Sequence, residues 1–164
     1  MMPEELPGDD HFNEPPAFFP REEDEERIPA DLGEPVEVTV EGVYAVEQNG
    51  HIQHYVLLTD GARRLAISIG PVEAHSISCA LANERYDRPL THDLLKAVID
   101  RLEGSVVRAV IDDLWNSTYY AKIFLRQGGE EMAIDARPSD AVAIAIRYEA
   151  PIFASDGILD AVDG

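Results

Sequence analysis

The sequence contains one pattern twice, and this repeat limits the folds that the chain can adopt. In each copy an alternating apolar segment runs into a proline, an acid follows two residues later, and an apolar helical run begins. Pro71 corresponds to Pro138 and Glu73 to Asp140, a constant offset of 67 positions (138 − 71 and 140 − 73). The two copies are Leu65–Ala74 and Met132–Ala141. We therefore expect a duplicated supersecondary unit.

Duplication would place Glu73 and Asp140 at equivalent points of a pseudo-symmetric fold. Two interpretations of these acids are open. If each proline occupies the first helical position, each acid occupies the third, where a carboxylate can bond a free backbone N–H and oppose the helix dipole. Paired carboxylates are also a common basis of hydrolytic chemistry. Arg137 and Ser139 favour the second interpretation for the second copy, because the first copy has no polar side chain at the corresponding positions.

The first 35 residues differ in composition from the rest of the chain. They contain 12 acidic side chains, two basic side chains and seven prolines. This segment carries −10 of the net charge of −19, which leaves −9 for residues 36–164. Such a composition cannot offset the entropy cost of ordering. We expect residues 1–35 to be a disordered acidic tail, either purely solubilising or a weak docking motif through its phenylalanines. Residues 36–164 are expected to fold.

Composition also limits the partners and the compartment. An acidic chain has little non-specific affinity for nucleic acid, because such binding depends on phosphate neutralisation. The single cysteine, Cys79, allows no intrachain disulfide. The N-terminus lacks the basic start and apolar core of a signal peptide, and no apolar run approaches the ~20 residues of a membrane span. We expect a cytoplasmic protein without membrane association.

The periodicity of residues 36–164 predicts an α+β domain built from a duplicated unit, residues 36–104 and 105–164. Each unit is expected to contain three mainly antiparallel strands followed by two helical elements, with the helices packed against one face of the sheet. The predicted strands are 36–46, 54–59, 64–69, 106–114, 119–125 and 132–136. Helices are predicted from Pro71, Leu90 and Pro138 and over 156–162, with a short extended piece at 151–154.

The second predicted helix combines an apolar stripe with a polar start. The stripe consists of Leu94, Leu95, Val98, Ile99 and Leu102. Gly104 is the expected C-terminal stop, Thr91 is a good N-cap, and Asp93 complements the helix dipole. His92 has no such structural purpose. A neutral imidazole beside a carboxylate can act as a general base or a metal ligand, and a hydrogen-bonded surface histidine is the alternative.

Asp135 ends the third predicted strand of the second unit. In an alternating strand, Ala133, Asp135 and Arg137 share one face, so Asp135 and Arg137 could line a common surface with Asp140 around the strand-to-helix corner. Mutual pairing of Arg137 with these acids is the alternative. The sequence has no closed zinc pattern, glycine-rich phosphate loop or nucleophile elbow.

Two polar motifs resemble the bifunctional nuclease (BFN) domain family. They are Arg88-Pro89-Leu90-Thr91-His92-Asp93-Leu94 and Ile134-Asp135-Ala136-Arg137-Pro138-Ser139-Asp140-Ala141. Ile69-Gly70 with Glu73-Ala74, the segment 117–121 and Pro151-Ile152-Phe153 support the resemblance, which covers about residues 36–163. The resemblance implies a duplicated α+β fold, a homodimer, and hydrolysis of phosphodiester bonds in DNA or RNA.

The motif match also assigns roles. It implies catalytic roles for Glu73, His92, Asp93 and Asp140, and substrate binding by Arg88, Thr91, Arg137 and Ser139. In the mechanism that we expect, His92 or a divalent cation activates water and the arginines stabilise the phosphate. A cation such as Mg²⁺ would be held by Glu73, Asp135 and Asp140.

A non-enzymatic function is the alternative. The duplicated domain could be a dimeric interaction or regulatory module, whose polar motifs hold helix starts and a subunit interface. An enzyme should gather His92, Asp93, Arg137 and Asp140 in one open cleft, whereas a module should bury them as paired caps and expose an apolar patch. A different phosphoester hydrolase is a third possibility.

Overall fold

The computed structural model describes residues 31–163, and the predicted tail lies outside the described residues except for its last five positions. The first unit consists of β1 (Pro35–Gln48), β2 (His51–Thr59), β3 (Arg64–Ile69), α1 (Pro71–Leu81) and α2 (Thr91–Arg101). The second consists of β4 (Gly104–Trp115), β5 (Thr118–Gln127), β6 (Glu130–Ala136), α3 (Pro138–Arg147), β7 (Ile152–Ser155) and α4 (Asp156–Asp163). The order of strands and helices predicted from the sequence is confirmed. None of the described helices has the length and apolar character that crossing a membrane requires.

The seven strands form one sheet in the order β3-β2-β1-β7-β4-β5-β6. Each unit contributes an antiparallel three-stranded meander, and β7 joins the two meanders at the centre. Ile152 of β7 pairs with Val38 of antiparallel β1 on one side and with Ala109 of parallel β4 on the other. The predicted α+β class with mainly antiparallel strands is therefore confirmed, and the segment expected only as a short extended piece is the central strand.

The hairpin turns use the residues that tight turns require. Asn49 and Gly50 have φ angles of 52° and 76°, and Gly128 and Gly129 have 57° and 83°. Positive φ at both central residues is the geometry of the type I′ turn, whose twist matches that of the flanking strands. These turns fix the registers of β1 with β2 and of β5 with β6.

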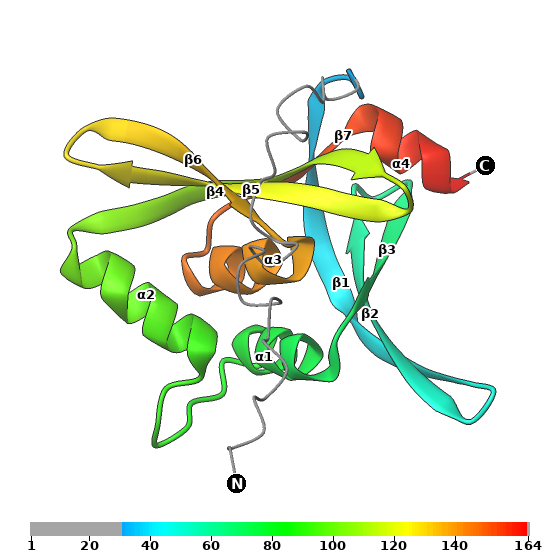
Figure 1. Ribbon diagram of the computed structural model, residues 1–164, viewed down its shortest axis with the longest axis horizontal. Coiled ribbons are helices and arrows are strands. Elements are labelled where there is room, and N and C mark those ends of the chain that lie inside the picture. Colours follow the sequence, from blue (N-terminus) through cyan, green and yellow to red (C-terminus); the bar gives the residue numbers. More distant parts are fainter. Residues whose placement is uncertain (1–30, 164) are drawn as a thin grey trace, which may run out of the picture. The chain divides into compact units, whose positions relative to one another are not determined.

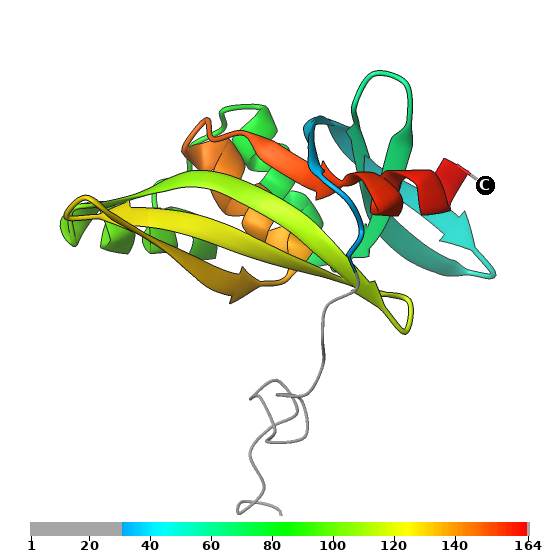
Figure 2. The ribbon, with the colours of Figure 1, turned by 90° about the horizontal axis from the view of Figure 1, so that it is seen from above.

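Helices α1, α2 and α3 lie on one face of the β4–β5–β6 meander (Figures 1 and 2). Helix α3 is the most buried, with five consecutive buried residues from Ala141 to Ala145. A helix that is apolar on all sides belongs in the interior, and α3 lies between the sheet and α1. The largest fully buried side chains are Leu58, Leu65, Ile77, Ile111, Ile144, Ile158 and Leu159.

Residues 31–35 contact the C-terminal end of the domain. The backbone N–H of Gly157 donates to the carbonyl of Leu32 at 2.7 Å, and the N–H of Asp156 donates to that of Glu34 at 3.0 Å. A Cβ on Gly157 would lie 2.9 Å from the Leu32 oxygen, so this close approach requires glycine. The described chain therefore joins the fold before Val36, where the sequence predicted the folded part to begin.

Helix α2 differs from its prediction at both ends. Its N-cap position is Leu90, not Thr91, because the Asp93 carboxylate accepts the Leu90 N–H at 2.9 Å and Thr91 is already helical. Glu103, with φ 58°, ends the helix in place of Gly104. Gly104 starts β4, and a Cβ there would lie 3.2 Å from the Ile99 side chain. Both predicted boundary residues were wrong.

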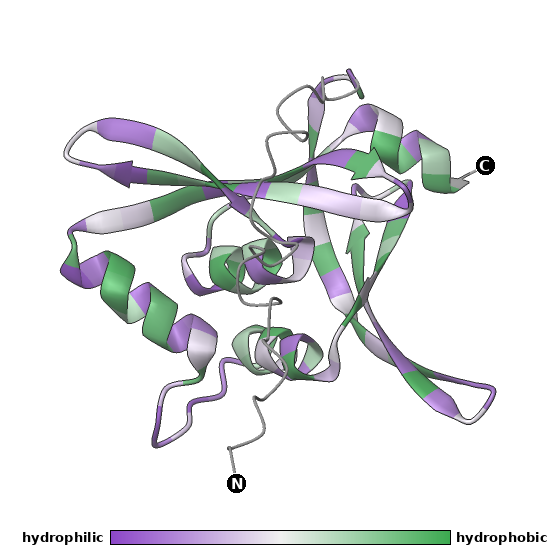
Figure 3. Cartoon of the chain, in the orientation of Figure 1, coloured by the Kyte–Doolittle hydropathy of each residue, from purple (hydrophilic) through white to green (hydrophobic). Residues whose placement is uncertain are grey.

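The apolar stripe predicted for α2 is mostly exposed. Of its five residues only Ile99 is buried, and the other four are between 40% and 62% exposed. Figure 3 shows hydrophobic residues along the length of α2. The stripe was predicted correctly as a pattern, but within the described chain it does not face the core.

Candidate functional site

The two strand-to-helix corners of the repeat and the start of α2 bring four side chains together. Helices α1 and α3 start directly after the third strand of each meander and lie side by side (Figure 1). Glu73 and Asp140 occupy the third helical position of α1 and α3, as the repeat predicted. In the described chain neither acid accepts the backbone N–H of its N-cap residue, whereas Asp93 accepts that of Leu90 in α2. The two carboxylates instead bond to side chains, and with His92 and Arg137 they form a cluster that we call the quartet.

Arg137 is the centre of the quartet. Its Nε donates to Asp140 Oδ2 at 2.7 Å, and its Nη2 donates to Asp140 Oδ1 at 3.1 Å. The same Nη2 donates to Glu73 Oε1 at 2.9 Å, which links the two corners. The Arg137 side chain is nevertheless 65% exposed. Arg137 therefore presents a cation at the surface in a fixed orientation.

Gly70 makes the contact between the corners possible. The Glu73 carboxylate folds back over Gly70 and occupies the place where a Cβ would lie. The backbone of Gly70 has φ −73° and ψ 160°, which any residue adopts, so a side chain here would only have to displace the Glu73 carboxylate. With no side chain in the way, Glu73 reaches Arg137 of the other corner.

His92 completes the quartet from α2. Its Nε2 lies 3.0 Å from Asp140 Oδ1, and its Nδ1 lies 2.8 Å from the hydroxyl of Ser76 on α1. His92 is 8% exposed. Both ring nitrogens are therefore engaged, and the predicted histidine lies inside the cluster instead of facing an open surface.

Asp93 lies beside His92 in sequence but belongs to a different contact. Besides the Leu90 N–H, it accepts a hydrogen bond from Arg147 Nε at 2.6 Å. The Arg147 side chain is 7% exposed and also donates to Ser76 Oγ at 3.1 Å and to the Ala143 carbonyl at 2.9 Å. Asp93 thus caps α2 and pairs with a buried arginine. The sequence analysis identified neither Ser76 nor Arg147 as site residues.

Hydrogen bonds in and beside the quartet shift the pKa values of Asp140, Arg137 and Asp93. The hydrogen bond from His92, followed by those from Arg137, lowers the pKa of Asp140 from 3.8 to about 2. Asp140, and then Glu73, raise the pKa of Arg137. For Asp93, burial alone would raise the pKa, but the hydrogen bonds from Arg147 and the Leu90 N–H outweigh burial and lower it. Asp140 is therefore a carboxylate throughout the neutral pH range.

The remaining predicted residues do not join the quartet. Arg88 and Thr91 are exposed, and in the described part of the chain neither side chain bonds to it. Ser139 is buried next to Asp140. Asp135 is exposed on β6, where it follows Ile134. Its backbone partner in the neighbouring strand β5 is Lys122.

A divalent cation would need free oxygen ligands, which Mg²⁺ prefers. Glu73 and Asp140 are already bridged by the Arg137 guanidinium, and Asp135 is not part of this cluster. Among residues 31–163, no three His, Cys, Asp or Glu side chains gather in a way that could hold a metal ion. The residues present do not form a preassembled magnesium site, and the metal set Glu73, Asp135 and Asp140 stays a prediction.

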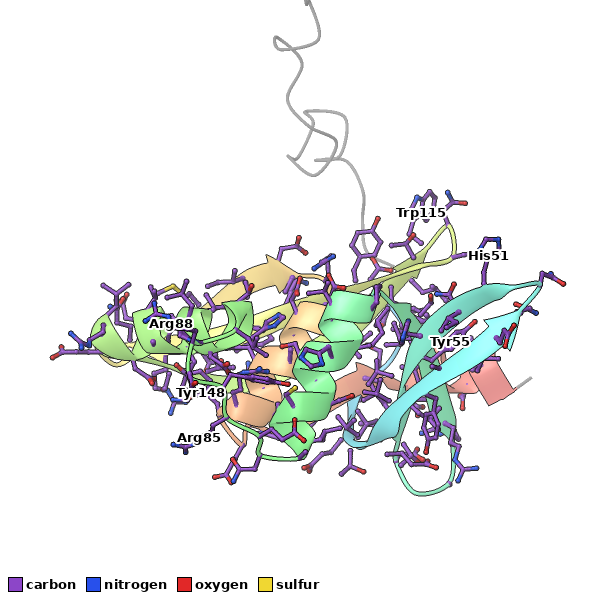
Figure 4. The ribbon with its side chains drawn as sticks, turned by 90° about the horizontal axis from the view of Figure 1, so that it is seen from below. His51, Tyr55, Arg85, Arg88, Trp115 and Tyr148 are labelled. Atoms are coloured by element: carbon purple, nitrogen blue, oxygen red, sulfur yellow. The ribbon has the colours of Figure 1, made fainter. Side chains whose placement is uncertain are left out.

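A groove among residues 31–163 lies next to the quartet but does not include it. Its volume is about 950 Å³, and Asp93, Arg147 and the loop between α1 and α2 contribute to its lining. Arg85 of this loop and Tyr148 also line it, and Figure 4 shows them on the same side of the molecule as Arg88. The groove is polar and carries more acids than bases along its walls, so we assign the chemistry to the quartet and not to the groove.

Comparison with known families identifies the family of the chain. The family model described as the bifunctional nuclease domain matches residues 56–163, which include all four residues of the quartet. The chain belongs to the bifunctional nuclease domain family. The resemblance found in the two sequence motifs is thereby confirmed.

Relatives of this BFN domain occur in bacteria and plants. The chain is 38% identical over 125 residues to an uncharacterized protein of Mycobacterium tuberculosis, covering 75% of this chain and 73% of the other. It is 34% identical over 103 residues to bifunctional nuclease 1 of Oryza sativa subsp. japonica, covering 59% of this chain and 31% of the rice protein. It is 29% identical over 116 residues to bifunctional nuclease 1 of Arabidopsis thaliana, covering 64% and 36%. The chain spans about a third of these plant proteins.

Proposed function

We propose that this BFN domain hydrolyses phosphodiester bonds in DNA or RNA, with Arg137 binding the phosphate. Family membership and the nuclease names of the plant relatives support a nucleic-acid substrate. The observation that carries the proposal is the geometry of Arg137, which is held by two carboxylates while most of its side chain faces solvent.

Phosphodiester hydrolysis requires positive charge where the phosphate oxygens gain negative charge. A guanidinium N–H donates a strong hydrogen bond to a phosphate oxygen, and a donor that is held in place before the reaction needs no reorganisation. Nε and Nη2 of Arg137 are used to hold it, and within residues 31–163 its Nη1 has no partner. Nη1 is therefore the group that would bind the substrate.

In this proposal the His92–Asp140 pair positions the attacking water. Asp140 is ionised at neutral pH, so its oxygens can only accept hydrogen bonds. His92 Nε2 lies 3.0 Å from Asp140 Oδ1 and holds this carboxylate in place beside Arg137. A water that donates a hydrogen bond to Asp140 would be oriented for attack on a phosphate bound by Arg137.

The charge of the domain favours a transient encounter with nucleic acid. Residues 36–164 carry −9, and two of the four quartet residues are acids. Non-specific affinity requires several phosphate contacts with Lys or Arg, and one arginine supplies only one of them. We therefore expect weak binding and strong dependence of binding on salt concentration.

The test is cleavage of single-stranded and duplex DNA and RNA by the purified full chain, with Mg²⁺ or with EDTA. The decisive variant is Arg137→Ala, and its matched control is Arg64→Ala. Arg64 is 67% exposed and also pairs with a glutamate, Glu41. Cleavage that is lost only in Arg137→Ala supports the proposal. Equal cleavage by both variants would refute it.

The exposed face of α2 favours a second property, association of two copies. Leu94, Leu95, Val98 and Leu102 of α2 are exposed, as are Met132 and Ile134 of the edge strand β6. Exposed apolar patches on soluble domains mark interaction surfaces, and an edge strand offers unpaired backbone groups to another strand. A homodimer through this face is compatible with nuclease activity and is also what a purely structural module would form.

The cytoplasmic location stays a prediction.

A further inference from the structure

A row of hydrogen bonds runs through the interior from one end of α3 to the other by way of α1 and α2. Arg147, the last residue of α3, donates from Nη2 to Ser76 Oγ of α1 at 3.1 Å. Ser76 Oγ lies 2.8 Å from His92 Nδ1 of α2, and His92 Nε2 lies 3.0 Å from Asp140 Oδ1 at the start of α3. The charged groups beside this row are Asp93 at the Arg147 end and Arg137 with Glu73 at the Asp140 end.

The chemistry of the two ends fixes the direction of the bonds there, and for a neutral imidazole it also fixes the direction of the middle bond. A guanidinium has only donors, so Ser76 Oγ accepts from Arg147. Asp140 is ionised and can only accept, so His92 Nε2 carries a proton and donates it. In the neutral imidazole Nδ1 then has a lone pair, and the Ser76 hydroxyl donates to it. The tautomer of His92 follows from its partners.

We propose that Ser76 and Arg147 are positioning residues for the His92–Asp140 pair. Arg147 orients the Ser76 hydroxyl, Ser76 holds the imidazole ring at Nδ1, and the ring in turn holds Asp140 against Arg137. The catalytic effect of this arrangement rests on the proposed function, but its geometry does not. Neither residue belongs to the two polar motifs of the sequence.

Ser76 has the residue type of a nucleophile but not its surroundings. Ser76, His92 and Asp140 are the three residue types of a serine hydrolase triad. Ser76, however, is only 4% exposed, and its oxygen already accepts a hydrogen bond from Arg147. A substrate cannot reach this oxygen, so the hydroxyl positions the imidazole and does not attack.

The geometry can be tested by NMR on the full chain labelled with ¹⁵N-histidine, with the His92 signals assigned by their loss in His92→Gln. We expect the proton on Nε2, protected from solvent exchange, and an Nδ1 chemical shift typical of a hydrogen-bond acceptor. In Ser76→Ala the Nδ1 shift should move to the value of an unbonded nitrogen, and the Nε2 proton should exchange about tenfold faster or more. Ser78→Ala, an exposed serine of the same helix, should match the parent.

Arg147→Lys provides an independent variant if Ser76→Ala does not fold. Lysine keeps the charge beside Asp93 but lacks the planar fork that reaches Asp93 and Ser76 together. The Nδ1 shift should move in the same direction as in Ser76→Ala, by a smaller amount. An unchanged Nδ1 shift in the folded variants, or a parent with its proton on Nδ1, would overturn the proposal.

Cleavage assays supply a second readout. Ser76→Ala should lower kcat by about tenfold to about a hundredfold with little change in KM, because the reacting groups are misplaced while Arg137 still binds phosphate. Ser78→Ala should retain full activity. If the parent cleaves no nucleic acid, the proposed function fails, and the NMR result still decides whether Ser76 and Arg147 position His92.

Discussion

Gly70 and Arg137 occupy equivalent positions in the two repeats. Because Gly70 has no side chain, there is room beside it for the glutamate that bonds to Arg137. They are separated by the repeat offset of 67 (137 − 70). Glu73 lies over Gly70 and bonds Arg137, whereas Arg137 itself bonds Asp140, the equivalent of Glu73. The two corners have diverged to form one asymmetric cluster in place of two symmetric half-sites.

Gly70→Ala should break the contact between the corners. The new Cβ would displace the Glu73 carboxylate, so the bond to Arg137 would be lost while the backbone stays unstrained. The part of the stability loss that depends on Glu73 should be less than about 1 kcal/mol, because Arg137 is mostly exposed. Urea unfolding of Gly70→Ala in the parent and in a Glu73→Ala background measures it. An identical cost in both backgrounds would contradict this account.

Asp140→Asn should change how stability depends on acid. The pKa of Asp140 is lowered in the folded protein, so the carboxylate stabilises the fold above the pKa of the unfolded chain, near 3.8, and this stability is lost as pH falls toward about 2. A shift of this size corresponds to about 2 kcal/mol. The free energy of unfolding of the parent minus that of Asp140→Asn should shrink between about pH 4 and pH 2. A difference that stays constant over this range would show that Asp140 is not held by His92 and Arg137.

Asp93→Asn should cost more stability than the equivalent change at Asp100 of the same helix. Asp93 neutralises Arg147, which is buried, and a buried charge without its partner is strongly destabilising. Asp100 pairs with Lys96, and both side chains of that pair are substantially exposed. We expect a loss of about 2–3 kcal/mol for Asp93→Asn and less than about 1 kcal/mol for Asp100→Asn in urea unfolding. Equal losses would mean that Arg147 does not depend on Asp93.

Val98→Glu should dissociate the proposed homodimer. A glutamate on the exposed face of α2 would have to lose its hydration in the interface, which is costly for an unpaired charge. Sedimentation velocity should show a dimer for the parent and a monomer for the variant at the same concentration. Ile52→Glu is the matched control, because Ile52 is 65% exposed on the β1–β2 hairpin, far from α2 in sequence. A monomeric parent would exclude the dimer, and dissociation of the control would place the interface elsewhere.

Most of the fold could be predicted because its signals are local. Alternation of apolar residues marks the six long strands, the prolines mark the starts of α1 and α3, and Asn-Gly and Gly-Gly mark two hairpins. The role of β7 could not be predicted, since a four-residue extended segment does not show which strands it will pair with. The boundaries of α2 were misplaced because Asp93 supplies its cap from inside the helix, and because Gly104 starts β4 in close contact with Ile99 and does not end the helix.

The candidate site was also predictable only in part, because only some of its signals are local in the sequence. The repeat and the motifs identified Glu73, His92, Arg137 and Asp140, which the structure brings together. They did not separate Asp93 from this cluster, because neighbours in sequence point in different directions around a helix. Ser76 and Arg147 were missed since each looks ordinary in its own segment, a serine in an apolar helix and an arginine in the last helical turn. Their roles become visible only in the structure, where α1, α2 and α3 are in contact.

The central position of β7 bears on how quickly this domain can fold. Each meander can pair locally, strand after neighbouring strand, but β1 and β4 gain their shared neighbour only when residues 152–155 close a long loop back to residues 35–38. Loop closure of this kind costs chain entropy before any pairing compensates for it, which is why non-local sheets fold slowly. Glu73 and His92 come from the first unit and Arg137 and Asp140 from the second, so local hairpins alone cannot form the quartet, which requires contacts between distant parts of the chain.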